Sequence, residues 1–481
     1  MKNNSLFFFV LASLGAAIGI GNIWAYPYYS FKFTGLFFLP YLISLVALGL
    51  PLLILEFSVG QYFNKNVVDL FSSVKKWLSG IGWFMLFNAF ILMSIYAVIL
   101  SWHIVYLFAS FGQQWKKGAK AYFFQNVLQA SEGFNGFAHF SLLIFIALIV
   151  AWALIFFYVK NGFESLKRRF FITMPIFIFL MLLCLAYSLS LDYALSGINS
   201  FLKPNLKNLM KLDVWISAFS LAAVSLGLSF GIFHSFARKT EKGFLIGNSL
   251  IIVAFEILIT IAIGLTLFSI LGFLGAKQNA SIENLIGSDV SYPFTTLAQS
   301  LPLLPKASIS SLIFFTFLLI FFIFGTVSLA YALTHVLVHK FKTKHRNAAI
   351  ITAGFGFLFG LVLVIKPGYY IMDIISHFFY YNILIALLLE TIAIGWFFES
   401  QKIADFINQT TSLKIGNLWR FMIKYIIPLI FLALLFVQVK SDFLLNYKGY
   451  PLLFNVVFGI GIVVFPLVIA FLMPQKILDR K

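Results

Sequence analysis

Cysteine and acidic residues are scarce in this sequence. The 481 residues include a single cysteine, Cys184, and 16 Asp and Glu residues against 34 Lys and Arg. One cysteine excludes an intrachain disulfide framework and a cysteine-based metal site. Charged residues make up only 10% of the chain, whereas 61% is hydrophobic, with a mean hydropathy of +0.98. A chain so poor in charge is typical of a polytopic membrane protein and not of a soluble domain.

The basic excess gives a net charge of +18, but the Lys and Arg residues form no continuous stripe. They lie in short loops between apolar segments, where they can face anionic lipid. Nucleic acid is therefore not an expected partner, whereas the lipid bilayer is. The sequence also contains no nucleophile–base constellation and no metal-binding motif, so an enzyme is not expected.

Hydropathy predicts twelve membrane-spanning segments. Their approximate limits are residues 5–30, 36–60, 81–111, 139–159, 170–191, 213–237, 244–274, 308–339, 347–366, 371–398, 420–438 and 452–473. Every Arg and most Lys fall on the side of the N-terminus when that end is placed inside. By the positive-inside rule, we predict a multi-pass protein of the cell inner (plasma) membrane with both termini cytoplasmic. The first segment has almost no charged n-region and no small-residue cleavage site, so it is not expected to be a cleaved signal.

The first span contains an unusual run, GAAIGIGNIWAYP, at residues 15–27. Gly costs about 1 kcal/mol relative to Ala in a helix interior, and Pro about 3 kcal/mol. Within a membrane, an unwound turn is tolerated only where it lines a cavity or binds a ligand. The run therefore predicts a broken helix whose freed backbone groups act as ligands. Close packing of a glycine-rich helix is the alternative interpretation.

The sixth span contains a second run of small and polar residues, SLGLSFG, at residues 225–231. Two interrupted helices at matching positions indicate a transport site between inverted repeats. An offset of five spans reverses the orientation of the second half. We therefore predict a first five-helix repeat at 1–200, a second, inverted repeat at 201–400, and two additional C-terminal transmembrane helices at 401–481.

The run GAAIGIGNIWAYP, followed by LPYLISLVALGLPLLILEFSVGQY at 39–62, resembles the first two helices of the neurotransmitter:sodium symporter family. The bacterial leucine transporter belongs to that family. Looser matches are YAVILSW in the third span, WISAFSLAAVSLGLSFG in the sixth and GTVS in the eighth. The resemblance implies an all-α fold of twelve transmembrane helices, with a 5+5 inverted repeat and unwound first and sixth helices. It also implies secondary active transport.

The resemblance further implies a substrate site at the two breaks. The groups that would hold a substrate carboxylate are the amides of Ile20 and Gly21 and the hydroxyl of Tyr96. The carbonyls that would receive its ammonium belong to Ala17, Val224, Ser225 and Gly227. The side-chain pocket would be lined by Leu92, Phe230, Val327 and Tyr331. Family members that carry decarboxylated amines have Asp where Gly19 stands here, so this chain is expected to bind a small amino acid, which supplies its own carboxylate.

Two sodium sites are also implied by the resemblance. The first would use the carbonyls of Gly15, Ile18 and Ile323 with the hydroxyl of Thr326. The neighbouring hydroxyl usual in the family is replaced by Val327, and Ser328 follows one residue later. The second would use Ala17, Asn22, Ser225 and the substrate carboxylate. Glu256 lies at or next to the place of the asparagine that usually completes this site.

Three acids lie deep in predicted spans, where ionisable groups are functional candidates. Glu56 and Glu390 match family positions that support the unwound helices. Glu256 has three interpretations: a sodium ligand, a proton carrier or a fixed negative charge. Chloride-dependent relatives hold chloride near this point, where the matching residues here are Tyr41 and Ser225. Leu221 replaces an expected amide there, and a carboxylate nearby makes chloride unnecessary, so chloride is not expected.

The charged gates of the family are not evident in this sequence. Ala25 replaces the outer Arg, and the matching acid falls at or near Ser376, with Asp373 close by. Lys239 replaces an inner-gate Tyr, and no acid is apparent near Lys340. Packing is therefore expected to replace the gate ion pairs. His234 and His335 lie on spans that can bring them together, with helix-packing roles expected.

We predict sodium-coupled symport of a small amino acid by alternating access. Two alternatives remain open: proton-coupled transport through Glu256, and a diverged non-transporting membrane sensor or accessory protein. The missing gate charges favour the latter, whereas the GIGN run and Tyr96 argue against it.

Overall fold

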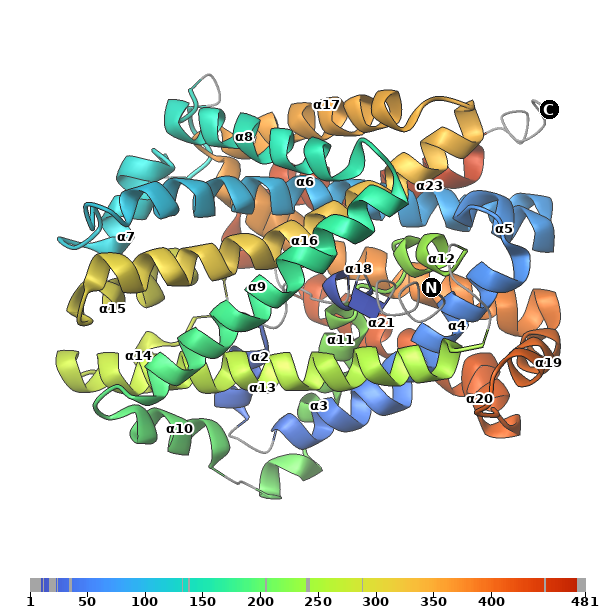
Figure 1. Ribbon diagram of the computed structural model, residues 1–481, viewed down its shortest axis with the longest axis horizontal. Coiled ribbons are helices and arrows are strands. Elements are labelled where there is room, and N and C mark those ends of the chain that lie inside the picture. The colour runs from blue at the N-terminus through green and yellow to red at the C-terminus, as the bar shows by residue number, and fades with distance from the viewer. Residues whose placement is uncertain are drawn as a thin grey trace.

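The computed structural model describes residues 10–11, 13–16, 23, 25–33, 37–131, 133–136, 139–203, 206–238, 243–287, 289–444 and 447–473. Within these ranges the protein is built from helices, joined by turns and short loops (Figure 1). The sole β feature among them is an isolated antiparallel bridge between Phe140 and Ile365. The all-α class expected from the sequence is therefore confirmed.

Ten helical runs in the described ranges are long and apolar enough to cross a membrane. They are Phe38–Phe63, Lys76–Ala109, Leu142–Val159, Phe163–Leu189, Leu245–Gln278, Ala307–Phe341, His345–Val364, Gly368–Thr410, Asn417–Gly449 and Leu452–Leu472. They coincide with ten of the twelve expected spans. The total of twelve, the inverted repeat and its domain boundaries remain predictions.

The two remaining spans are the first and the sixth. The sixth is split into α11 (Leu212–Ser225) and α12 (Ile232–Ala237), which are separated by the non-helical residues 226–231. The first is described at residues 10–11 and 13–16, which are helical, and at α2 (Ala25–Lys32). The interruption of the sixth span is confirmed, whereas residues 17–22 and 24 of the predicted break at 15–27 lie outside the described residues.

The main helices within the described residues are distributed along the whole chain. They are α3 (Phe38–Ser44), α4 (Leu50–Phe63), α5 (Val67–Val74), α6 (Ser79–Ala109), α8 (Leu142–Val159), α9 (Phe163–Leu189), α10 (Ala194–Leu202), α13 (Leu245–Gln278), α16 (Ala307–Phe341), α17 (His345–Val364), α18 (Gly368–Ile392), α19 (Ser400–Thr410), α21 (Ile427–Leu444) and α23 (Gly461–Leu472). Single π-helical turns interrupt several long runs, for example at Leu45–Gly49 between α3 and α4.

Helix α8 shows why these apolar runs form membrane helices. It is apolar on every side. One face, with Ile144, Leu148 and Ala151, is buried, whereas the opposite face, with Leu142 and Ile146, is exposed. A helix that is hydrophobic all round requires an apolar environment on both faces. The packed face contacts α6, α16 and α17, so the exposed face is left for lipid.

The helices pack around a central region that contains the split sixth span. Helix α6 lies along α16, α13 packs against α9 and α10, and α12 packs against α4 (Figure 1). Helix α11 contacts α3, α2 and α18. The two short halves of the sixth span therefore end inside the protein, among the long helices, and not at its surface.

Candidate functional site

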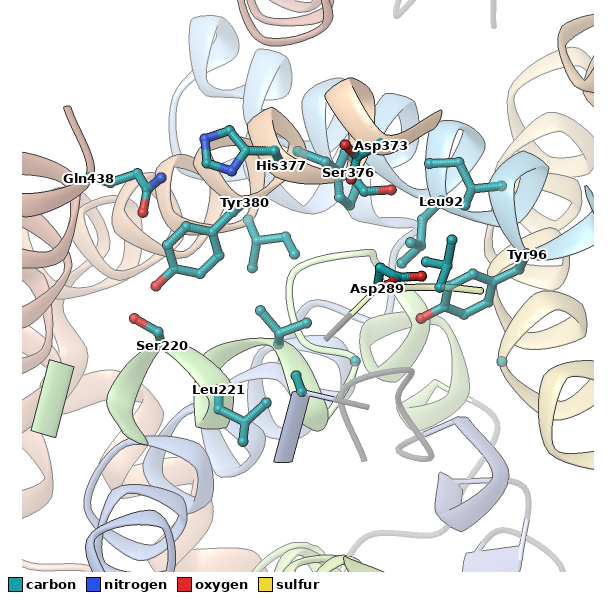
Figure 2. A pocket seen from close by; sticks show the side chains of 18 of the residues that line it. Leu92, Tyr96, Ser220, Leu221, Asp289, Asp373, Ser376, His377, Tyr380 and Gln438 are labelled. Carbon is teal, nitrogen blue, oxygen red and sulfur yellow. The ribbon is translucent and has the colours of Figure 1, made fainter. Parts of the chain in front are cut away.

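A cavity of about 610 Å³ lies where the split sixth span meets α2, α6, α16, α18 and α21 (Figure 2). This volume is in the range of small-molecule sites. Its lining includes Ala16 and Ala25 from the first span and Gly325 from α16. The described lining residues include Asp289 and Asp373 but no Lys or Arg. The cavity is therefore bounded by the split sixth span and by described residues of the first span.

The segment between α11 and α12 is held in a non-helical conformation. Gly227, Ser229 and Gly231 have positive φ angles of 66°, 68° and 72°. A side chain at Gly227 would place its Cβ 2.7 Å from the carbonyl oxygen of Ala16, so this segment lies directly against the first span. The Ser229 amide donates a hydrogen bond of 2.5 Å to Glu56 Oε1. Glycine and this buried carboxylate together stabilise the break.

Five of the predicted substrate-site residues line the cavity: Leu92, Tyr96, Val224, Gly227 and Phe230. Leu92 and Tyr96 lie on one side, and Tyr380, His377 and Gln438 on the other (Figure 2). The Tyr96 hydroxyl is turned toward the middle of the cavity (Figure 2). The ring of Tyr96 packs edge-on against Phe322 at 5.7 Å, so its direction is set by α16.

The other predicted substrate-site residues lie elsewhere. Ala17, Ile20 and Gly21 are outside the described residues. Ser225, Val327 and Tyr331 are fully buried and are not among the residues that line the cavity. Tyr331 packs between Phe163 and Phe236, with ring centroids 5.7 and 5.5 Å away.

The predicted sodium ligands on α16 are buried. Thr326 Oγ1 donates to the Phe322 carbonyl at 2.7 Å, which leaves its lone pairs available to a cation. The Ser328 hydroxyl is buried without a partner among the described residues. Gly15 lies close to this helix, because a Cβ there would be 3.1 Å from the Phe324 ring. Ile323 on the same helix is buried, with 7% of its surface exposed. Ala17, Ile18 and Asn22 lie outside the described residues.

Glu256 lies on α13 and is 1% exposed. The Tyr41 hydroxyl on α3 donates to its Oε1 at 3.1 Å. Ser225 and Thr260 lie within interaction distance of the same hydroxyl. The structure therefore groups Glu256 with Tyr41 and Ser225, the two residues that the resemblance places at a chloride site.

The outer gate positions face the same cavity without forming an ion pair. Ala25 and Ser376 both line it. The nearby Asp373 accepts hydrogen bonds from Lys448 Nζ at 2.8 Å and from the Tyr450 hydroxyl at 3.0 Å. Its charge is therefore used to tie α18 to the segment after α21.

The expectation for Lys340 is wrong, because an acid does lie beside it. Lys340 at the end of α16 forms an ion pair with Asp69 on α5. The two residues are 271 positions apart, so no local sequence pattern connects them. Lys239 lies outside the described residues.

A second feature that sequence reasoning missed involves His234 on α12. Its ring lies between Glu56 on α4 and Glu390 on α18, with both carboxylates in contact. The sequence signal for this cluster is a histidine inside the apolar sixth span, together with the acids Glu56 and Glu390 inside two other apolar spans. His335, which the sequence suggested as a neighbour of His234, lies instead against His339 and Arg238.

Comparison with known proteins bears on this arrangement. The family model described as "Sodium:neurotransmitter symporter family" matches residues 2–121 and 114–479. An uncharacterised sodium-dependent transporter of Methanocaldococcus jannaschii is 30% identical over 475 residues, covering 97% of this chain and 96% of the relative.

Two animal proteins are also similar. The sodium- and chloride-dependent GABA transporter 2 of Rattus norvegicus is 25% identical over 92% of this chain and 80% of its own. The sodium- and chloride-dependent GABA transporter ine of Drosophila melanogaster is 26% identical over 84% of this chain, but the match spans about half (47%) of that longer protein.

Proposed function

The chain belongs to the sodium:neurotransmitter symporter family, and we propose that it carries a small amino acid together with sodium by alternating access. Members of this family are sodium-dependent membrane transporters and not enzymes. The observation that carries the finer proposal is the cavity shared by the split sixth span, the first span and Tyr96.

Helix ends in this cavity support an amino acid as the substrate. Helix α11 ends at Ser225, and the C-terminal end of a helix favours a cation such as an ammonium group. Val224 and Gly227 at that end line the cavity. The two acids in the lining already accept hydrogen bonds, Asp289 from Tyr369 and Asp373 from Lys448. The end of α11 would then bind the substrate ammonium, and the Tyr96 hydroxyl would bind the carboxylate that the substrate supplies.

Sodium would bind beside this cavity. The hydroxyls of Thr326 and Ser328 are oxygen ligands of the kind that hard cations prefer. They lie on the part of α16 whose Gly325 and Leu329 line the cavity. We propose that sodium binds here, between α16 and the first span, and that it links the two elements when substrate is present.

The topology forms part of the same proposal. Twelve spans, an inverted repeat over 1–200 and 201–400, and cytoplasmic termini in the inner membrane are consistent with the ten observed helical runs and the split sixth span. Movement of the first and sixth spans relative to their neighbours would open the cavity to each side in turn.

A ligand screen by thermal shift tests this function. A ligand that binds only the folded protein raises its stability by about 2.7 kcal/mol at a concentration of 100 Kd. We expect one small amino acid to stabilise the purified protein in sodium but not in potassium at equal ionic strength. Stabilisation in potassium at low pH alone would instead support proton coupling. A response to no amino acid in either salt would contradict the proposal.

Gly227→Ala is expected to weaken amino-acid binding at least tenfold. A left-handed conformation costs a non-glycine residue about 1–2 kcal/mol, and the new Cβ would also approach the Ala16 carbonyl at 2.7 Å. Binding isotherms on purified protein would measure the change. Gly247→Ala is the matched control, because a Cβ there meets no atom within 4 Å. Unchanged affinity in Gly227→Ala would show that this segment does not shape the site.

Transport is expected to continue when chloride is replaced by gluconate. The Glu256 carboxylate is buried and hydrogen-bonded to Tyr41. In this proposal it would supply the negative charge that chloride supplies in chloride-dependent relatives. Uptake into proteoliposomes with sodium gluconate on both sides would measure this. Loss of uptake in gluconate would overturn chloride independence.

A further inference from the structure

A buried cluster of three ionisable residues lies between α4, α12 and α18. Glu56, His234 and Glu390 are each 0% exposed. His234 Nδ1 lies 3.4 Å from Glu56 Oε2, and His234 Nε2 lies 3.1 Å from Glu390 Oε1. We propose that this Glu–His–Glu cluster is a proton-binding site whose occupancy is coupled to the conformation of the split sixth span. The coupling to transport rests on the proposed function.

The geometry favours a proton over a metal ion. Ligand atoms from the three residues lie within 4.8 Å of one another, a spacing that also suits a metal. However, a metal would take one imidazole nitrogen and gather both carboxylates on that side of the ring. Here each nitrogen faces a different carboxylate. An imidazole attracts a carboxylate at each of its nitrogens only when both nitrogens carry hydrogen, which requires one bound proton beyond the neutral ring.

Loss of this proton would break one of the two contacts. The imidazolium would release a proton to water, and the neutral ring would keep a single N–H. One ring nitrogen would then direct its lone pair toward a carboxylate oxygen that lies 3.1 or 3.4 Å away, and this contact would no longer be attractive. Two buried carboxylates would also remain without a counter-charge, which is unfavourable in a protein interior. The cluster is therefore stable as packed here only while the proton is bound.

Other charged groups around the cluster are engaged elsewhere. On α5, the ring centroid of Phe71 lies 6.1 Å from that of His234, and Asp69 is paired with Lys340 of α16. At the end of α12, Arg238 lies 3.4 Å from Asn64 and 3.3 Å from His335. Among the described residues, the ion pairs of Glu56 and Glu390 are thus formed with His234 and not with a Lys or Arg.

The cluster is mechanically connected to the transport cavity. Glu56 uses its other oxygen to hold the Ser229 amide in the segment between α11 and α12. That segment carries Gly227 and Phe230, which line the cavity. Helices α4 and α12 are also tightly packed, because a Cβ at Gly60 would lie 2.7 Å from the His234 carbonyl. Separation of α12 from α4 and α18 would therefore expose His234 and release the proton.

The protonation state tests the site independently of transport. Nitrogen NMR of ¹⁵N-histidine-labelled full-length protein in nanodiscs distinguishes an imidazolium from a neutral ring. At about pH 9 an ordinary histidine is neutral. We expect one imidazolium signal at that pH, present in wild type and in His335→Gln, and absent in His234→Gln. If His234→Gln does not fold, Glu390→Gln replaces it and should also abolish the signal. Absence of the signal in wild type, or its persistence in His234→Gln, would overturn the proposal.

Titration with zinc chloride addresses the metal alternative. We expect no zinc binding that depends on His234. Stoichiometric binding lost in His234→Gln would replace the proton assignment with a metal site.

Proton movement tests the coupling to transport. In proteoliposomes that enclose a pH-sensitive dye, sodium-driven amino-acid uptake should change the internal pH. His234→Gln should reduce the proton movement per amino acid taken up at least fivefold. Equal proton movement per amino acid in His234→Gln and wild type would refute the coupling. If no amino acid is taken up but the imidazolium signal is present, the proposed substrate fails while the proton site stands.

Discussion

Tyr96→Phe is expected to lower the affinity for the transported amino acid about 10- to 100-fold, because a hydrogen bond to a charged group contributes about 1.5–3 kcal/mol. The Tyr96 hydroxyl is turned into the cavity, and its ring packs edge-on against Phe322. Phenylalanine keeps that ring contact and removes only the hydroxyl. The loss should therefore appear in binding, without a change in thermal stability of the ligand-free protein.

Competition binding with the amino acid found by the thermal-shift screen would measure this effect. Tyr28→Phe is the matched control, because Tyr28 lines the same cavity from α2 but has no predicted role with the carboxylate. A second comparison uses the decarboxylated amine of the same amino acid, which should bind wild type and Tyr96→Phe equally weakly. Equal affinity of wild type and Tyr96→Phe for the amino acid would exclude a contact between Tyr96 and the carboxylate.

Glu256→Gln is expected to reduce chloride-free transport at least tenfold and to make the remaining transport respond to chloride. The substitution removes a buried negative charge but retains an oxygen that can accept from the Tyr41 hydroxyl. Local packing is therefore preserved while the electrostatic potential beside Ser225 changes. Charge interactions are strong in such a buried site because little water screens them.

Uptake by wild type and Glu256→Gln, each in chloride and in gluconate, would measure the coupling between the carboxylate and the anion. Glu283→Gln is the control, because Glu283 is an exposed acid on the short helix Ile282–Leu285. Restoration of Glu256→Gln by chloride would support a fixed-charge role. A loss that chloride does not relieve, together with a changed pH dependence, would instead support Glu256 as a proton carrier.

The gate regions show which features can be read from the sequence and which depend on the packing of the helices. Absence of the outer Arg at Ala25 is a local property that the sequence displays directly. The use of Asp373 by Lys448 and Tyr450, and the pairing of Lys340 with Asp69, depend on the packing of distant helices. The structure therefore shows an ion pair on α16 and another on α18, whereas the sequence led us to expect packing alone at the gates.

Composition and local pattern alone dictate the membrane class, the positions of ten helical runs and the interruption of the sixth span, because hydrocarbon solvates apolar side chains but not free backbone groups. Five cavity-lining residues could also be predicted from the sequence, through the resemblance. Only tertiary packing decided that Tyr41 meets Glu256 and that His234 lies between Glu56 and Glu390. These residues come from helices far apart in the chain, and their contacts depend on the rotation and depth of each helix, which hydropathy does not encode.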